Sequence, residues 1–112
     1  MSKTNWKSAQ DFRPDGYTAR LLHDCTPCRV VLFNLNAGQA VEPHKANACV
    51  VMHVVDGAGF IRKGEEEYSV SKDDLMFFEP LEIHGMRAAE NESINILATI
   101  IPAPAGAGTC SH

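Results

Sequence analysis

Two histidines of this chain lie where predicted strands meet turns. His44 comes directly after Pro43, at the end of a strand-like segment, and His84 begins another such segment four residues after Pro80. Neutral imidazole is the commonest side-chain ligand for Zn, Fe, Ni and Cu. Because both histidines lie where a strand meets a turn, both could point into one end of a barrel. An open metal site normally uses three protein ligands, so this pair needs a helper.

Short strands must position the two histidines. The apolar runs are rich in β-branched and aromatic residues, which is typical of strands, and turn residues separate them. Strands are expected at 17–23, 28–35, 49–55, 59–63, 66–70, 75–79, 83–88 and 94–101. Short strands with almost no helix predict an all-β fold, either an antiparallel β-barrel or a double-sheet jelly roll. The interior of such a barrel packs solid or holds one small ligand.

Length and composition favour one small domain. The chain has 112 residues, of which 45% are hydrophobic, and a net charge of −4. A nucleic-acid module would need a basic stripe, so this class is excluded, and no apolar run approaches the ~20 residues of a membrane span. Residues 1–7 carry lysines without a following apolar run, which predicts no export signal and a cytoplasmic protein with reduced cysteines.

Three segments are expected along the chain. Residues 1–27 form an N-terminal segment with one strand, which packs on the barrel or on a dimer partner. Residues 28–101 form the barrel. Residues 102–112 form a flexible tail, because the sequence from Pro102 to Gly108 alternates proline, alanine and glycine and cannot extend a central strand.

The sequence around His44 resembles the first motif of the cupin superfamily, whose members are small β-barrels. That motif reads glycine, five residues, histidine, one residue, histidine, three or four residues, glutamate, six residues and glycine. Gly38, His44 and Gly57 match its two glycines and its first histidine. Ala46 stands at the second histidine, and Val50 stands at the glutamate.

The sequence before His84 resembles the second cupin motif. Pro80 and His84 match its proline and histidine, with the histidine one residue early, while Asp74 and Glu82 replace glycines. The resemblance spans residues 28–101 and implies a jelly-roll barrel and a homodimer. It also implies that His44 and His84 are metal ligands, for one divalent transition metal such as Fe, Mn, Ni or Zn.

Three further side chains are candidate helpers for the metal. Glu42 shares the alternation of His44, although Pro43 disturbs the count, and Cys49 lies beside the replaced glutamate. His53 points to the opposite face from position 50 unless a bulge reverses the alternation. An empty pocket, or one that holds only an organic ligand, is the alternative.

Apolar side chains and cysteines complete the candidate site residues. Met52, Phe60, Phe77 and Met86 are expected to line the pocket, although strand alternation alone would also bury them. Cys25 and Cys28 form a Cys-x-x-Cys before a strand, not before a helix as in thioredoxins. They are interpreted as free thiols, as a surface disulfide, or as metal ligands together with Cys110 and His112 of the tail.

Two functions follow from these residues. The first is a metal-dependent enzyme that acts on a small organic molecule, of dioxygenase, isomerase or lyase type. The second is a non-catalytic module that binds or senses a small ligand without a metal. Neither hypothesis involves nucleic acid or a membrane as a partner.

Overall fold

The computed structural model describes residues 3–102, and these contain eight strands and no α-helix. Most of the predicted tail therefore lies outside the described residues. All strand pairs are antiparallel, which confirms the predicted all-β fold. The strands are β1 (Thr18–Cys25), β2 (Cys28–Leu35), β3 (Ala40–His44), β4 (Cys49–Lys63), β5 (Glu66–Ser71), β6 (Leu75–Phe78), β7 (His84–Ala88) and β8 (Ile94–Ile101).

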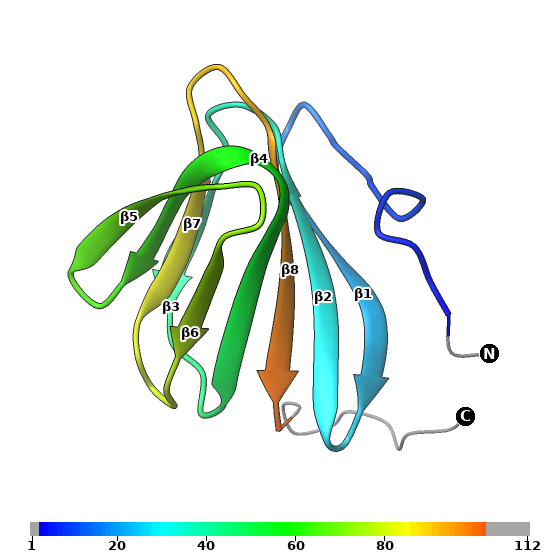
Figure 1. The fold of residues 1–112 in the computed structure, drawn as a ribbon, viewed down its shortest axis with the longest axis vertical. Coiled ribbons are helices and arrows are strands. Elements are labelled where there is room, and N and C mark those ends of the chain that lie inside the picture. Colours follow the sequence, from blue (N-terminus) through cyan, green and yellow to red (C-terminus); the bar gives the residue numbers. More distant parts are fainter. Residues whose placement is uncertain (1–2, 103–112) are drawn as a thin grey trace.

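Strand β4 connects two sheets that curl around a common interior (Figure 1). Its first half pairs with β8 and β6, and its second half pairs with β7 and β5. One sheet therefore has the order β1-β2-β8-β4-β6, and the other has the order β3-β7-β4-β5.

The prediction of two separate strands at 49–55 and 59–63 is wrong, because a bulge lets β4 run continuously through both. The register against β8 shifts between Val54 and Asp56, and the strand continues instead of turning. Gly57 allows this path because its φ is +90°, and a Cβ there would lie 2.1 Å from the backbone oxygen of Ser93. A bulge adds a residue and bends the strand, which carries β4 from one sheet into the other.

Alternating residues of both sheets fill the interior. Along β4, Val50, Met52 and Val54 are buried and belong to the main hydrophobic cluster. Each such side chain contributes about 1.5–3 kcal/mol when it leaves water. The alternation fixes which face each neighbour takes, so residues 51 and 53 lie on the outer face.

The N-terminal segment covers part of the outer face of the first sheet. Ala9 packs with Leu32 and Val55 in a second small cluster, which Trp6 also contacts. The backbone N–H of Asp11 donates to Asn34 Oδ1 at 2.7 Å. These contacts tie the segment to the sheet, beside β1 and β2 in Figure 1.

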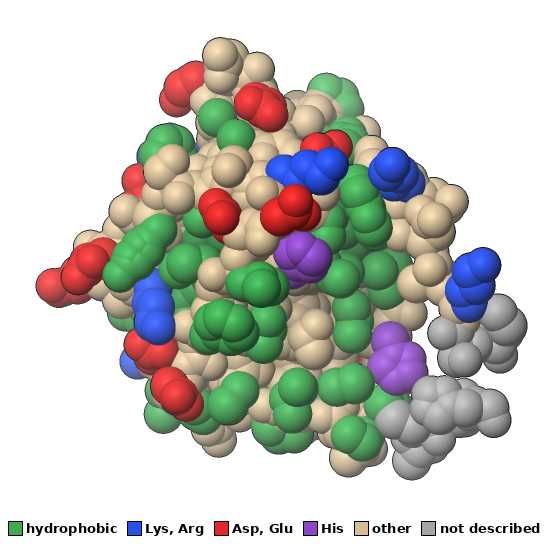
Figure 2. Space-filling view, in the orientation of Figure 1, with side chains coloured by type: hydrophobic (Ala, Val, Ile, Leu, Met, Phe, Trp, Pro, Cys, Tyr) green, Lys and Arg blue, Asp and Glu red, His purple; other side chains and the backbone are tan. Residues whose placement is uncertain are grey.

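Exposed charged side chains lie on turns and also on strands, such as Glu66 and Glu67 of β5. Figure 2 shows acidic side chains mostly toward the top and left of the view, with hydrophobic side chains over the strands at its centre. Among residues 3–102, no helix is long and apolar enough to cross a membrane.

Candidate metal centre

His44 and His84 face each other across β3 and β7. They are direct partners in the antiparallel register, so their side chains lie on the same face of the sheet. Their Nε2 atoms lie 3.0 Å apart, and their ring centroids lie 4.2 Å apart at an interplanar angle of 68°. The fold thus brings together two imidazoles that are 40 residues apart in the sequence.

A bulge in β3 places His44 on the interior face. Val41 pairs with Met86 and His44 pairs with His84, so three steps along β3 match two steps along β7. Pro43 lies at this irregularity, and a Cβ on the facing Gly85 would lie 3.3 Å from Pro43 Cα. The extra residue reverses the alternation between Val41 and His44.

Backbone carbonyls orient both rings. His44 Nδ1 lies 3.1 Å from the carbonyl oxygen of Glu42, and His84 Nδ1 lies 3.3 Å from that of Glu82. A carbonyl oxygen only accepts hydrogen bonds, so each Nδ1 carries the hydrogen that is donated. In the neutral rings both Nε2 atoms then present lone pairs to each other at 3.0 Å, an arrangement that only a cation or a shared proton stabilises.

Burial disfavours the proton at one of these rings. His84 is only 4% exposed, and its ring lies 5.3 Å from that of Phe78. Desolvation lowers the pKa of His84 below its usual value of 6.5, and the neighbouring His44 lowers it further. The Nε2 lone pair of His84 is therefore available at neutral pH.

A small cavity of about 50 Å³ adjoins the two imidazoles. Its walls are apolar apart from the histidines, and they include Ala46 and Val50, which stand where the cupin motif has a histidine and a glutamate. The remaining wall residues come from β2, β4, β7 and β8. They are Phe33, Met52, Met86, Ala98 and Ile100.

None of the three candidate helpers lines this cavity. Glu42 is exposed, because the bulge at Pro43 puts it on the other face from His44. Cys49 is exposed because its neighbour Val50 takes the inner face. His53 pairs with Leu97, which packs in the outer cluster, and the bulge in β4 comes too late to turn His53 inward.

The predicted wall residues divide between the inner and outer faces. Met52 and Met86 line the cavity. The structure places Phe60 in a separate cleft, where the guanidinium carbon of Arg87 lies 4.2 Å from its ring centroid. Phe77 pairs with Val51 on the outer face and is 61% exposed. The predictions for Phe60 and Phe77 are therefore wrong. Side chains alternate along a strand, and their neighbours Ile61 and Phe78 take the inward positions.

The sequence did not predict three wall residues on the sheet that faces the histidines. Phe33, Ala98 and Ile100 belong to β2 and β8, which are remote in sequence from both histidines. Their inward alternation was a usable signal, but only the sheet order shows which strands face the pair.

The fold and the motif residues define a cupin barrel, and comparisons with known proteins bear this out. A structure of TT1209 from Thermus thermophilus superposes with a TM-score of 0.87 at 22% identity, covering 93% of this chain and 100% of that one. An RmlC-like cupin protein from Desulfovibrio desulfuricans superposes with a TM-score of 0.82 at 24% identity, covering 91% of this chain and 97% of that one. These likenesses show the fold alone.

The sequence also identifies a family within this fold. Residues 30–105 match the AraC-like ligand binding domain family, and the chain belongs to it. A Klebsiella pneumoniae protein with a double-stranded β-helix domain shares the architecture, with a TM-score of 0.87 at 14% identity over 100% of this chain and 99% of that one. No curated protein sequence matches the chain.

Proposed function

We propose that the barrel binds one divalent transition metal through Nε2 of His44 and Nε2 of His84, and that the metal binds a small organic ligand. The observation that carries this proposal is the pair of Nε2 atoms 3.0 Å apart. Two metal–nitrogen bonds of 2.0–2.1 Å at angles near 90–110° place the nitrogens about 2.9–3.4 Å apart. The spacing therefore fits two adjacent ligands of one ion.

The carbonyl contacts of both rings support the same proposal. Metal-binding histidines almost always donate their other ring N–H to an oxygen, which fixes the tautomer and raises the basicity of the ligand nitrogen. The carbonyls of Glu42 and Glu82 are such acceptors. The pair thus has the orientation of a metal ligand set before any ion binds.

The donor set and the cavity restrict what is bound. Imidazole suits Zn, Ni, Fe and Cu, and two neutral ligands without a carboxylate leave the full charge of the ion uncompensated. A water-sized group needs about 10–15 Å³, so the cavity of about 50 Å³ holds only a few such groups beside the ion. Most of an organic ligand would lie at the mouth, on the exposed side of His44. There the metal would supply a positive charge that binds and polarises an oxygen or nitrogen donor.

A binding or sensing role without catalysis is the second candidate. The family to which the chain belongs is described as a ligand binding domain. Among the residues that line the cavity, the two histidines are the only titratable groups, so a general acid or base would have to come from the ligand or from outside the cavity. Turnover of a bound ligand that His84→Ala abolishes would exclude this candidate.

Calorimetric titration with Ni²⁺ tests the metal site. The protein carries no histidine tag, is stripped with a chelator, and carries Cys28→Ser so that the free thiol of Cys28 does not contribute. We expect one equivalent to bind, and we expect His44→Ala and His84→Ala each to weaken this binding by about 100-fold or more. His53→Ala is the matched control, because His53 lies on the outer face of β4. Binding that survives both cavity variants would overturn the proposal.

We also propose that the chain forms a homodimer through β6. Among the described strands, β6 pairs only with β4, and it carries two exposed apolar side chains, Leu75 at 52% and Phe77 at 61%. An unpaired strand edge with apolar side chains favours association with a second copy. Light scattering during gel filtration should give a dimer mass that Phe77→Ser reduces, and a monomer at every concentration would contradict this proposal.

A further inference from the structure

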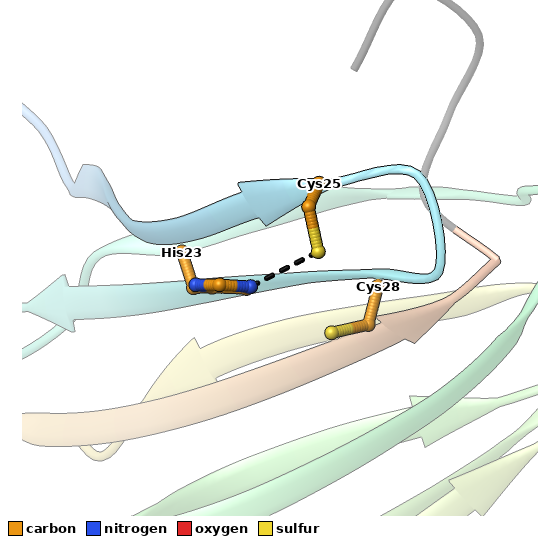
Figure 3. Close-up of side chains that lie close together, drawn as sticks. All are labelled: His23, Cys25 and Cys28. Carbon is orange, nitrogen blue, oxygen red and sulfur yellow. Dashed lines mark hydrogen bonds between the residues drawn. The ribbon is translucent and has the colours of Figure 1, made fainter. Parts of the chain in front are cut away.

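A second group of metal-ligand side chains lies at the end of the β1–β2 hairpin (Figure 3). His23, Cys25 and Cys28 offer one nitrogen and two sulfurs, all within 4.8 Å of one another. His23 Nε2 lies 3.0 Å from Cys25 Sγ. Cys25 and Cys28 are direct partners in the β1–β2 register, joined by Thr26 and Pro27, so their side chains lie on one face.

We propose that these three residues, here named the hairpin cluster, bind one Zn²⁺ when Cys25 is reduced. Thiolate and imidazole are the ligands that Zn²⁺ prefers, and a Cys-x-x-Cys is a common spacing for its ligands. This site is distinct from the His44–His84 pair and does not depend on it.

The geometry of the hairpin cluster fits a tetrahedral ion. Zn–S bonds of about 2.3 Å at tetrahedral angles place two sulfurs about 3.8 Å apart. The ligand atoms all lie within 4.8 Å, so the closing movement is at most about 1 Å, which side-chain rotation supplies. The strand ladder already fixes the backbones of all three residues, because His23 pairs with Val30 and Cys25 pairs with Cys28.

The oxidation state of Cys25 controls the proposed site. Cys25 is disulfide-bonded in the structure, whereas Cys28 is a free thiol. A cellular dithiol that reduces this disulfide transfers two electrons and two protons, becomes a disulfide itself, and leaves Cys25 as a thiol. Zn²⁺ then displaces the protons of the Cys25 and Cys28 thiols and binds the two thiolates. Thiol–disulfide exchange with an oxidised disulfide compound forms the disulfide of Cys25 again, reduces that compound to its dithiol and releases the ion.

A cleft beside the hairpin cluster leaves room for a fourth ligand. His23 lines a cleft of about 380 Å³ together with Trp6, Leu22 and Lys3, among other residues. Three protein ligands leave one position of a tetrahedral zinc open. Water or the donor atom of a small molecule in the cleft would occupy it.

Zinc and cobalt titrations in the presence and absence of a phosphine reductant test the proposal. The protein carries His44→Ala, so that the imidazole pair cannot bind the added metal. We expect one equivalent of Zn²⁺ to bind only after reduction, and Co²⁺ in its place to give thiolate-to-metal charge-transfer absorption. We expect Cys28→Ser and His23→Gln each to weaken binding by about 100-fold or more, a loss of about 2.7 kcal/mol or more. Cys49→Ser is the matched control, because Cys49 is a free thiol on another strand.

Alkylation of the unmutated chain provides a second measurement that needs no variant. In reduced protein, Zn²⁺ should protect Cys25 and Cys28 from an alkylating reagent, while Cys49 is modified at the same rate with and without the ion. Equal protection of Cys49, equal zinc binding by oxidised and reduced protein, or cobalt spectra without thiolate bands would each overturn the proposal. A failure here leaves the His44–His84 result unaffected, because that titration is made with Cys28→Ser.

Discussion

The imidazole pair and the hairpin cluster are assembled in opposite ways. His44 and His84 are 40 residues apart and meet only because β3 and β7 pair inside the completed barrel. The ligands of the hairpin cluster come from residues 23–28, which a single turn brings together. The first site therefore depends on the whole fold, whereas the second depends on one hairpin.

The two sites also differ in their donor atoms and their surroundings. The pair offers two neutral nitrogens at the edge of a small apolar cavity. The hairpin cluster offers two sulfurs and a nitrogen beside a larger cleft. Imidazole accepts several transition metals, whereas thiolates favour Zn²⁺ and Cu⁺. The difference means that each site should respond to changes that leave the other unaffected.

The largest expected effect comes from His84→Ala. This change removes one of two ligands, so Ni²⁺ affinity at the pair should fall by about 100-fold or more. Zinc binding by the reduced hairpin cluster should not change. Calorimetry with each ion on the same variant measures both. Equal losses at both sites would show that the variant damages the fold and not one site.

Gly57→Ala should destabilise the barrel and thereby weaken metal binding at the imidazole pair. Its φ of +90° and the overlap of an added Cβ with the backbone oxygen of Ser93 predict a loss of about 2–4 kcal/mol in the free energy of unfolding. Thermal unfolding measures this loss, at about 4–8 °C per kcal/mol for a domain of this size. Nickel binding at the pair should then disappear together with the barrel on heating.

Gly64→Ala is the control for this change. Gly64 also has a positive φ, +63°, but a Cβ there meets no atom within 4 Å. We expect a smaller loss, about 1 kcal/mol. Similar losses for the two glycines would contradict the role of Gly57 as the point where β4 passes closely against β8.

Val50→Glu should strengthen metal binding at the pair. Val50 is buried, lines the cavity and stands where the cupin motif has a glutamate, so a carboxylate there adds both a ligand and a negative charge. We expect Ni²⁺ affinity to rise by about 10–100-fold, and the metal-free protein to lose stability because it buries a carboxylate. Val51→Glu, on the outer face, should change neither. Calorimetry and thermal unfolding measure both effects, and unchanged affinity for Val50→Glu would place the metal elsewhere.

The smallest expected effect is that of pH on the pair. A lowered pKa means that His84 keeps its Nε2 lone pair at a lower pH than an ordinary histidine, so protons at His84 should not weaken Ni²⁺ binding from pH 8 to about 6.5. Below that range protons compete for Nε2 and affinity falls. Zinc binding at the hairpin cluster releases thiol protons and should weaken throughout this range. A steeper pH dependence of Ni²⁺ binding at the imidazole pair than of Zn²⁺ binding at the hairpin cluster would contradict this prediction.

The sequence predicts the barrel and the pair because both rest on short-range patterns. Alternating apolar residues identify the strands, Gly38 and His44 have the spacing of the first cupin motif, and His84 stands one residue early in the second. Ala46 and Val50, which replace the histidine and the glutamate of the motif, both line the cavity. The fold class and the two histidines can thus be predicted from the residues alone.

Bulges cause part of the remaining errors. Register shifts between Leu21 and His23, between Val41 and His44, and between Val54 and Asp56 each add a residue that alternation cannot locate. The second shift removes Glu42 from the site, and the third joins two predicted strands into β4. The sequence does not predict that His23 lies close to the two cysteines, because this proximity depends on the β1–β2 register and on the side-chain rotamers.

Pulsed electron paramagnetic resonance of the Cu²⁺-loaded protein tests the central claim most directly, because it detects the distal nitrogens of coordinated imidazoles. In the Cys28→Ser protein, the account predicts signals from two imidazoles, from one after either His44→Ala or His84→Ala, and from none after both. A two-imidazole spectrum that survives the double variant would contradict the assignment of the metal to this pair.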